Sequence, residues 1–178
     1  MKVIFLDIDG VLNCSGSKSS MVLENGETYL GIDKHKILRL KEIVDRSGAK
    51  IVLISTWRLH LYKNDRVDKY MRQRFKKYRI EIYSCVDYIE YNRGSGIHLW
   101  LLEHPDVTDW VVLDDEWFLD YNEKISQHLI LTDGEAVEGG LRDEHISVAC
   151  DILNGKLQDQ QLKDLDHPDQ WIHVGLAQ

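Results

Sequence analysis

Two aspartates two residues apart, Asp7 and Asp9, are the residues of this sequence best suited to chemistry. They follow a run of four apolar residues, 3–6, that predicts a strand buried on both faces. Side chains at positions i and i+2 of an extended segment point to the same side, so the two carboxylates can converge. Converging carboxylates repel each other, and a bound cation is a natural way to keep both ionised.

Other interpretations of the same stretch lead to different structures. The pair Asp9-Gly10 is also a common hairpin turn signal. An EF-hand calcium loop begins with D-x-D as well, but it needs glycine at its sixth position, whereas here glycine is the fourth. The EF-hand interpretation therefore fails, and Gly10 instead allows a sharp turn or the close approach of a ligand.

Two further apolar runs end in side chains that could serve the same site. Residues 50–54 are followed by Ser55 and Thr56, whose hydroxyls can bind a phosphate oxygen or merely cap the next helix. Residues 110–113 are followed by Asp114 and Asp115. A strand, a helix and a strand at this spacing form a βαβ unit with parallel strands, which brings the strand ends to one edge of the sheet.

The elements that must position these residues alternate between strand and helix. Asp33 is a candidate cap for a helix that ends near Ser47, before Gly48. The other expected elements are a loop or short hairpin at 14–31, helical character at 59–78, a strand at 80–83, a helix from Ser95 or Gly96 to His104, a strand at 128–131 and a helix at 143–153. The expected fold class is α/β, a Rossmann-like three-layer sandwich with a mainly parallel central sheet.

Length and composition limit the classes of protein. The 178 residues suit one domain at 1–155, followed by a polar C-terminal extension at 156–178. The longest apolar runs are too short to span a membrane, and the three cysteines form no C-x-x-C pair. We therefore expect no membrane association and a cytoplasmic, reducing location. The sequence leaves monomer and dimer open.

Positive charge is concentrated in one segment, residues 58–79. This segment carries +7, so the rest of the chain carries −15 within a net charge of −8. Such asymmetry is typical either of a face that meets a polyanion or of an ordinary solvated helix face.

The order and spacing of the motifs resemble the haloacid dehalogenase-like (HAD) phosphohydrolase superfamily. The first, second and fourth motifs of that superfamily match "DIDGVLN", "IVLIS" and "VVLDD". The third motif normally supplies a lysine, and Arg93, 21 positions before Asp114, stands at a similar place. The stretches that look most like the small HAD domains of RNA-repair proteins are "GAKIVLISTWR", "RGSGIHLWLLEH", "VVLDD" and a late "GGL".

This resemblance implies a magnesium-dependent phosphatase with a minimal cap. Asp7 would attack phosphorus and form an aspartyl-phosphate, and Asp9 would act as general acid and then as general base. The implied Mg²⁺ ligands are Asp7, Asp9 (through its backbone carbonyl as well), Asp114 and Asp115. The implied phosphate-binding residues are Gly10, Ser55, Thr56 and Arg93.

The segment between the second and third motifs is short for a full cap, which favours an open site and a macromolecular phosphate. A nucleic-acid end or a nucleotide is the expected substrate, with the basic segment 58–79 along a phosphate backbone and with Trp57 and Arg58 as further substrate contacts. One alternative is a small-metabolite phosphatase whose lid is the 14–31 segment. Another is a HAD-fold binding or regulatory protein without turnover, which Arg93 in place of lysine would favour.

Overall fold

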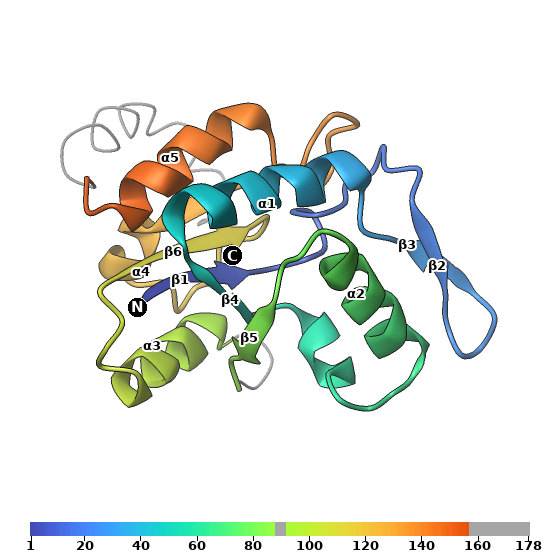
Figure 1. Cartoon of the computed structure of the whole chain (residues 1–178), viewed down its shortest axis with the longest axis horizontal. Helices are drawn as coiled ribbons and strands as arrows, with labels where there is room; N and C mark the ends of the chain where they lie inside the picture. The colour runs from blue at the N-terminus through green and yellow to red at the C-terminus, as the bar shows by residue number, and fades with distance from the viewer. Residues whose placement is uncertain (88–91, 157–178) are drawn as a thin grey trace, which may run out of the picture.

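A five-stranded parallel sheet forms the centre of the protein in this computed structural model, which describes residues 1–87 and 92–156 (Figure 1). The strand order is β5-β4-β1-β6-β7, and each neighbouring pair is parallel. The strands are β1 (Lys2–Leu6), β4 (Lys50–Leu53), β5 (Ile82–Cys85), β6 (Asp109–Asp114) and β7 (Leu129–Leu131). The predicted α/β class with a parallel central sheet is confirmed.

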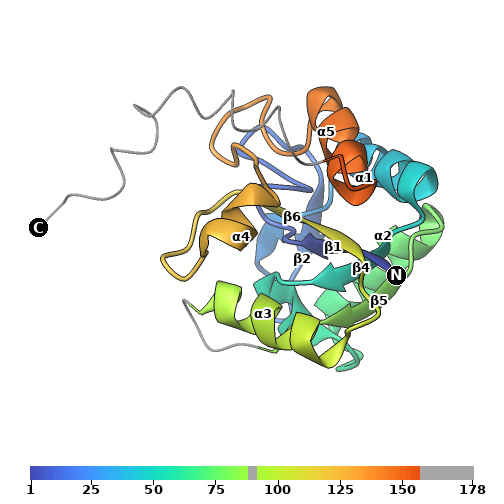
Figure 2. The same ribbon diagram turned by 90° about the vertical axis from the view of Figure 1, so that its left-hand side faces the viewer.

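Helices cover both faces of the sheet and complete three layers (Figure 2). The helices are α1 (Lys34–Ser47), α2 (Arg66–Lys77), α3 (Arg93–Glu103), α4 (Glu123–Gln127), α5 (Asp143–Leu153) and the short 3₁₀ helix η1 (Thr56–His60). Alternate residues of β1 divide between two cores: Ile4 and Leu6 pack with α1, α2 and α5, while Val3 and Phe5 pack with α3 and α4. This alternation explains why residues 3–6 are all apolar.

Local sequence signals fix several helix ends where they were predicted. The Asp33 side chain accepts a hydrogen bond from the backbone N–H of His35 and caps α1. Gly48 closes the same helix with φ of 69°. Other boundaries were wrong: α3 begins at Arg93 rather than at Ser95 or Gly96, and β5 is Ile82–Cys85 rather than 80–83. The segment predicted to have helical character, 59–78, contains the end of η1 and then α2, which begins only at Arg66.

The segment between β1 and α1 contains a β-hairpin formed by β2 (Ser20–Val22) and β3 (Thr28–Leu30). Because β1 and β4 are parallel, the start of η1 lies at the same end of the sheet as the turn after β1. The hairpin packs against α2 on that side of the molecule (Figure 1). The hairpin, η1 and α2 therefore surround the edge of the sheet at which the predicted site residues emerge.

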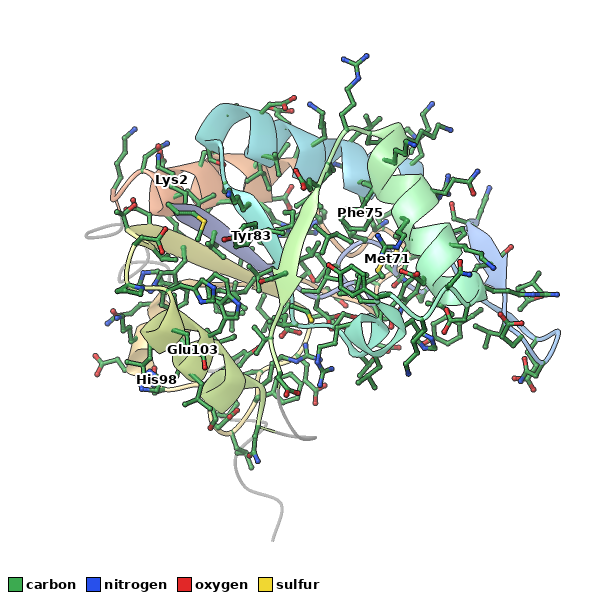
Figure 3. The ribbon with its side chains drawn as sticks, turned by 60° about the horizontal axis from the view of Figure 1, so that its bottom comes forward. Lys2, Met71, Phe75, Tyr83, His98 and Glu103 are labelled. Carbon is green, nitrogen blue, oxygen red and sulfur yellow. The ribbon has the colours of Figure 1, made fainter. Side chains whose placement is uncertain are left out.

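The helix α2 packs against the sheet through the apolar side chains on its inner face. Met71 and Phe75 point from α2 toward the centre of the molecule, whereas His98 and Glu103 lie on the outer side of α3 (Figure 3).

Within the described ranges, no helix has the length and apolarity needed to cross a membrane. Beyond Lys156, the predicted C-terminal extension lies outside the described residues.

Candidate active site

Asp7 is held at the end of β1 by backbone hydrogen bonds that continue the sheet beyond the strand itself. Its N–H donates to the carbonyl of Leu113 at 2.9 Å, and on the other side Ile54 N–H donates to Leu6 at 2.9 Å. The side chain is only 4% exposed. Two neighbouring strands thus fix both the position and the burial of this carboxylate.

Three carboxylates meet at this edge of the sheet. Asp7, Asp114 and Asp115 each present an oxygen, and these oxygens lie within 4.8 Å of one another. We call these three residues the acidic cluster. A set of carboxylate oxygens in which Asp114 is fully buried fits a hard cation such as Mg²⁺, which keeps waters and needs few protein ligands.

Arg93 is the cation that the structure itself places in this cluster. Its Nη1 lies 3.1 Å from Asp7 Oδ1 and 2.7 Å from Asp114 Oδ2. The guanidinium also lies over the ring of Phe118, 4.4 Å from its centroid. Its position in the first turn of α3 brings Arg93 to the two strand ends, as the resemblance to the third HAD motif implied.

The acidic cluster carries more negative charge than Arg93 compensates. Burial raises the pKa of Asp7 well above its ordinary value; Arg93 opposes this shift, and the carboxylates of Asp114, Asp115 and Asp9 add to it. Burial, followed by the charge of Asp114, raises the pKa of Asp115 to about 6. A divalent cation would supply the missing positive charge and favour the ionised carboxylates.

Asp9 lies outside the acidic cluster, and its carboxylate is held by two other side chains. Asn13 Nδ2 donates to Asp9 Oδ1 at 2.9 Å, and the indole Nε1 of Trp57 donates to Asp9 Oδ2 at 2.8 Å. Trp57 is 4% exposed. The ring of Trp57 is thus enclosed and its N–H binds Asp9, and a contact between Trp57 and the substrate stays a prediction.

Gly10 forms the turn that directly follows Asp9. Its φ is +69°, and a Cβ added there would lie 1.8 Å from Asp115 Oδ2. The Gly10 N–H donates to Asn13 Oδ1 at 2.9 Å, and its carbonyl accepts from Thr132 Oγ1 at 2.8 Å. Glycine suits this position for two reasons. Other residues rarely adopt the left-handed backbone conformation, and the Asp115 side chain occupies the space that a Cβ would need.

The end of β4 brings Ser55 and Thr56 to the same edge of the sheet. Ser55 is buried, and its Oγ accepts the backbone N–H of Trp57 at 3.3 Å, which caps η1. Thr56 is exposed. Arg58 is buried, and its Nη1 donates to the Ser55 carbonyl at 3.3 Å, which supports this turn. A contact between Arg58 and the substrate stays a prediction.

Three residues that support the site were not predicted from the sequence. Tyr121 donates its hydroxyl to Asp114 Oδ2 at 2.6 Å, and burial raises the pKa of this phenol far above its ordinary value. Asn13 and Thr132 hold the Gly10 turn. Only Asn13 left a local signal, as a short polar side chain that follows a D-x-D-G turn.

Comparison with known proteins agrees with this arrangement. The family model described as "HAD domain in Swiss Army Knife RNA repair proteins" matches residues 3–146. No curated protein and no solved structure gave a match. The matched range contains the ends of β1, β4 and β6 and the start of α3. The chain therefore belongs to this family of HAD domains and is a HAD-type phosphohydrolase domain.

Proposed function

We propose that the protein is a magnesium-dependent phosphatase that hydrolyses a phosphomonoester through an aspartyl-phosphate on Asp7. The observation that carries this proposal is the meeting of Asp7, Asp114 and Asp115 around the guanidinium of Arg93. Membership of a HAD family supports it independently. A bound Mg²⁺, held by the acidic cluster, would polarise a phosphoryl oxygen and offset the charge that repels a carboxylate nucleophile.

In this proposal, different residues act as the nucleophile, as the general acid and base, and as the groups that bind the phosphate. A carboxylate oxygen of Asp7 attacks phosphorus, the bond to the leaving oxygen breaks, and Asp9 gives that oxygen its proton. Asp9 then takes a proton from the water that hydrolyses the aspartyl-phosphate. Arg93 and the hydroxyls of Ser55 and Thr56 are the groups that would stabilise the equatorial phosphoryl oxygens.

We further propose that the phosphate belongs to a nucleic-acid end or a nucleotide. The family description names RNA repair proteins, and this supports a nucleic-acid substrate. Seven basic side chains of the 58–79 segment are exposed, and five of them form no salt bridge among the described residues: Lys63, Lys69, Lys76, Lys77 and Arg79. Lys63 and Lys69 lie before α2 and in its first turn, toward the site, whereas α2 carries Lys76 and Lys77 back toward the start of the parallel strand β5. Lys63 and Lys69 are therefore the cations that would contact a phosphate backbone near the site.

Not every basic residue of this segment is available for such contacts. Arg72 pairs with the buried Asp68 at 2.7 Å, Arg66 lies near Glu24, and Arg74 donates to the Ile32 carbonyl at 2.7 Å. These arginines support the fold of α2 and its neighbours. The proposed nucleic-acid contact therefore depends on exposed side chains that form no salt bridge, above all Lys63 and Lys69, more than on the net charge of the segment.

Tyr62 is a candidate stacking residue within the same segment. It is 74% exposed, its φ is +66°, and its backbone N–H donates to Asp68 Oδ1 at 3.3 Å. The guanidinium of Arg72 lies 4.8 Å from its ring centroid. A large aromatic side chain held outward in a sparsely populated backbone conformation favours stacking on an unpaired base.

Phosphate release from a substrate panel tests the proposed activity. The panel contains 3′- and 5′-phosphorylated oligonucleotides, mononucleotides and sugar phosphates, each with magnesium or with EDTA. We expect magnesium-dependent turnover that disappears in Asp7→Asn. A preference for sugar phosphates would favour the small-metabolite alternative, and magnesium binding without turnover would favour a binding protein.

The nucleic-acid proposal has its own test. We expect Lys63→Gln combined with Lys69→Gln to weaken oligonucleotide binding and to reduce the salt slope by about 1.4, if both contact single-stranded phosphates. Lys124→Gln combined with Lys156→Gln removes the same charge from α4 and from the residue after Gly155, and serves as the control. Equal binding by both double variants would contradict the proposal.

The predicted cytoplasmic location remains part of the proposal. The three cysteines, Cys14, Cys85 and Cys150, are free thiols, which is the form expected in a reducing compartment.

A further inference from the structure

Asp9 carries the proton in the proposed reaction, so its direction matters as much as its chemistry. A proton donor must lie within hydrogen-bond reach of the leaving oxygen. Asp9 is half-buried rather than enclosed, so packing alone does not fix its side chain. The contacts to its two carboxylate oxygens therefore decide where it points.

Each Asp9 oxygen accepts one hydrogen bond from a buried donor. The Asn13 amide that binds Oδ1 comes from the same turn, because Asn13 also accepts from the Gly10 N–H. The Trp57 indole that binds Oδ2 comes from a different part of the chain, 48 positions away. Without the indole, the Asp9 carboxylate keeps only its hydrogen bond to Asn13, which belongs to the same turn. The side chain of Asp9 can then change its rotamer whenever that turn moves.

Trp57 is itself well anchored. Its backbone N–H is bound by Ser55 Oγ at the end of β4. The centroid of its ring lies 6.5 Å from that of Tyr29 in β3 and 6.3 Å from that of Tyr70 in α2. The hydroxyl of Tyr70 in turn accepts from Ile32 N–H at 2.9 Å. The indole thus fixes the Asp9 carboxylate relative to β4, the hairpin and α2.

We propose that Trp57 is a positioning residue whose indole N–H aims Asp9 at the leaving-group oxygen. This inference rests on the proposed phosphatase function. A carboxyl oxygen that accepts one hydrogen bond still has a second lone pair, so the indole and Asn13 leave room for the transferred proton. In the first step, the Asp7–phosphorus bond forms, the phosphorus–leaving-oxygen bond breaks, and the Asp9 proton moves to that oxygen, which releases an alcohol and leaves Asp9 ionised.

The dependence of kcat/KM on the leaving group separates positioning from structural support. An alkoxide is a poor leaving group and needs the proton, whereas p-nitrophenolate leaves without one. Since kcat/KM reports only steps up to formation of the aspartyl-phosphate, later proton abstraction by Asp9 does not enter. We expect Trp57→Phe to lower kcat/KM about ten- to a hundredfold for an alkyl phosphate and less than about threefold for p-nitrophenyl phosphate.

A second variant keeps the experiment decisive if phenylalanine disturbs the fold. The isostere 3-benzothienylalanine, incorporated at position 57, keeps the bicyclic shape and replaces only the N–H by sulfur. It should show the same selective loss. Trp100→Phe is the matched control, because Trp100 is also buried and its indole N–H donates to Ser84 Oγ at 3.1 Å, outside the candidate active site.

The possible outcomes distinguish this inference from the function on which it rests. Equal loss with both esters, or no loss with the isostere, would overturn the positioning role and leave the phosphatase proposal standing. Hydrolysis of neither ester by the wild-type protein with magnesium would refute the phosphatase proposal itself, and the positioning role with it. A selective loss in Trp57→Phe and the isostere, but not in Trp100→Phe, is the expected result.

Discussion

Replacing Gly10 by alanine separates two contributions of the turn after β1. The first is backbone strain, because Gly10 has φ of +69°. The second is steric, because the new Cβ would lie 1.8 Å from Asp115 Oδ2 and 2.0 Å from its Cγ, so the Asp115 side chain must move. The protein contains a matched control in Gly48, which also has φ of +69° but has nothing within 4 Å of an added Cβ.

The two variants should differ in magnesium binding rather than in strain. The left-handed conformation costs an L-residue about 1–2 kcal/mol, which for a chain of this size lowers Tm by roughly 2–8 °C in both variants. At a magnesium concentration a hundredfold above Kd, binding stabilises the wild-type protein by about 2.7 kcal/mol. If displacement of Asp115 weakens magnesium affinity tenfold, that stabilisation falls to about 1.4 kcal/mol.

Thermal unfolding with EDTA and with magnesium measures both quantities. We expect Gly48→Ala to lose stability equally in the two conditions and to keep the wild-type magnesium increment. Gly10→Ala should lose about half of that increment and most of its phosphatase activity. A full magnesium increment in Gly10→Ala would refute the argument that Asp115 is a ligand held in place by the Gly10 turn.

Three further predictions concern the charges of the site. In urea titrations without magnesium, Arg93→Met should lose about 3–5 kcal/mol of unfolding free energy, because the buried carboxylates of Asp7 and Asp114 lose their guanidinium; an unchanged midpoint would contradict this ion-pair assignment. Tyr121→Phe should lose about 1.5–3 kcal/mol in the same assay, because Asp114 loses the hydroxyl donor 2.6 Å away, and a loss no larger than that of an exposed Tyr→Phe variant would show that this bond adds nothing. Without magnesium, the contribution of Asp115 and Asp7 to stability should fall as pH rises from about 4 to about 6, because the unfolded chain ionises near the ordinary pKa of 3.8 whereas Asp115 has a folded pKa of about 6 and Asp7 a raised one. Burial lowers the pKa of His128 and of His145, which contribute with the opposite sign, so wild type and Asp115→Asn are compared at each pH. Unfolding titrations at pH values across that interval check the sign, and Asp115→Asn should reduce the slope.

The end of the sheet that carries the site could be predicted because it follows from the order and direction of the strands. A parallel sheet brings its strand ends together, so Asp7, Ser55 and Asp114 could be assigned to one edge from strand patterns alone. Arg93 could be added only through the resemblance to the third HAD motif, and the predicted start of its helix was two or three residues late. The glycine after D-x-D could be predicted to turn sharply, although not to pack against Asp115.

The contacts that hold the site could not be predicted, because they join residues distant in sequence through single side chains. Nothing local to Trp57 indicates that its N–H reaches Asp9, and a tryptophan that closely follows a buried strand suits a core position equally well. The phenol of Tyr121 likewise reaches Asp114 from an irregular segment without periodicity. The count of basic residues in 58–79 also concealed which ones are engaged, since Arg72 and Arg74 have partners within the fold.

The most direct test of the account is to trap the phosphoryl group on Asp7. Wild-type, Asp7→Asn and Asp9→Asn proteins are mixed with radiolabelled p-nitrophenyl phosphate and magnesium, quenched in acid, and digested to locate the label. We predict label on the peptide containing Asp7 in the wild-type protein, more label in Asp9→Asn because hydrolysis of the aspartyl-phosphate is slowed, and none in Asp7→Asn. Phosphate release by the wild-type protein without any label at Asp7, together with an active Asp7→Asn variant, would contradict the proposed mechanism.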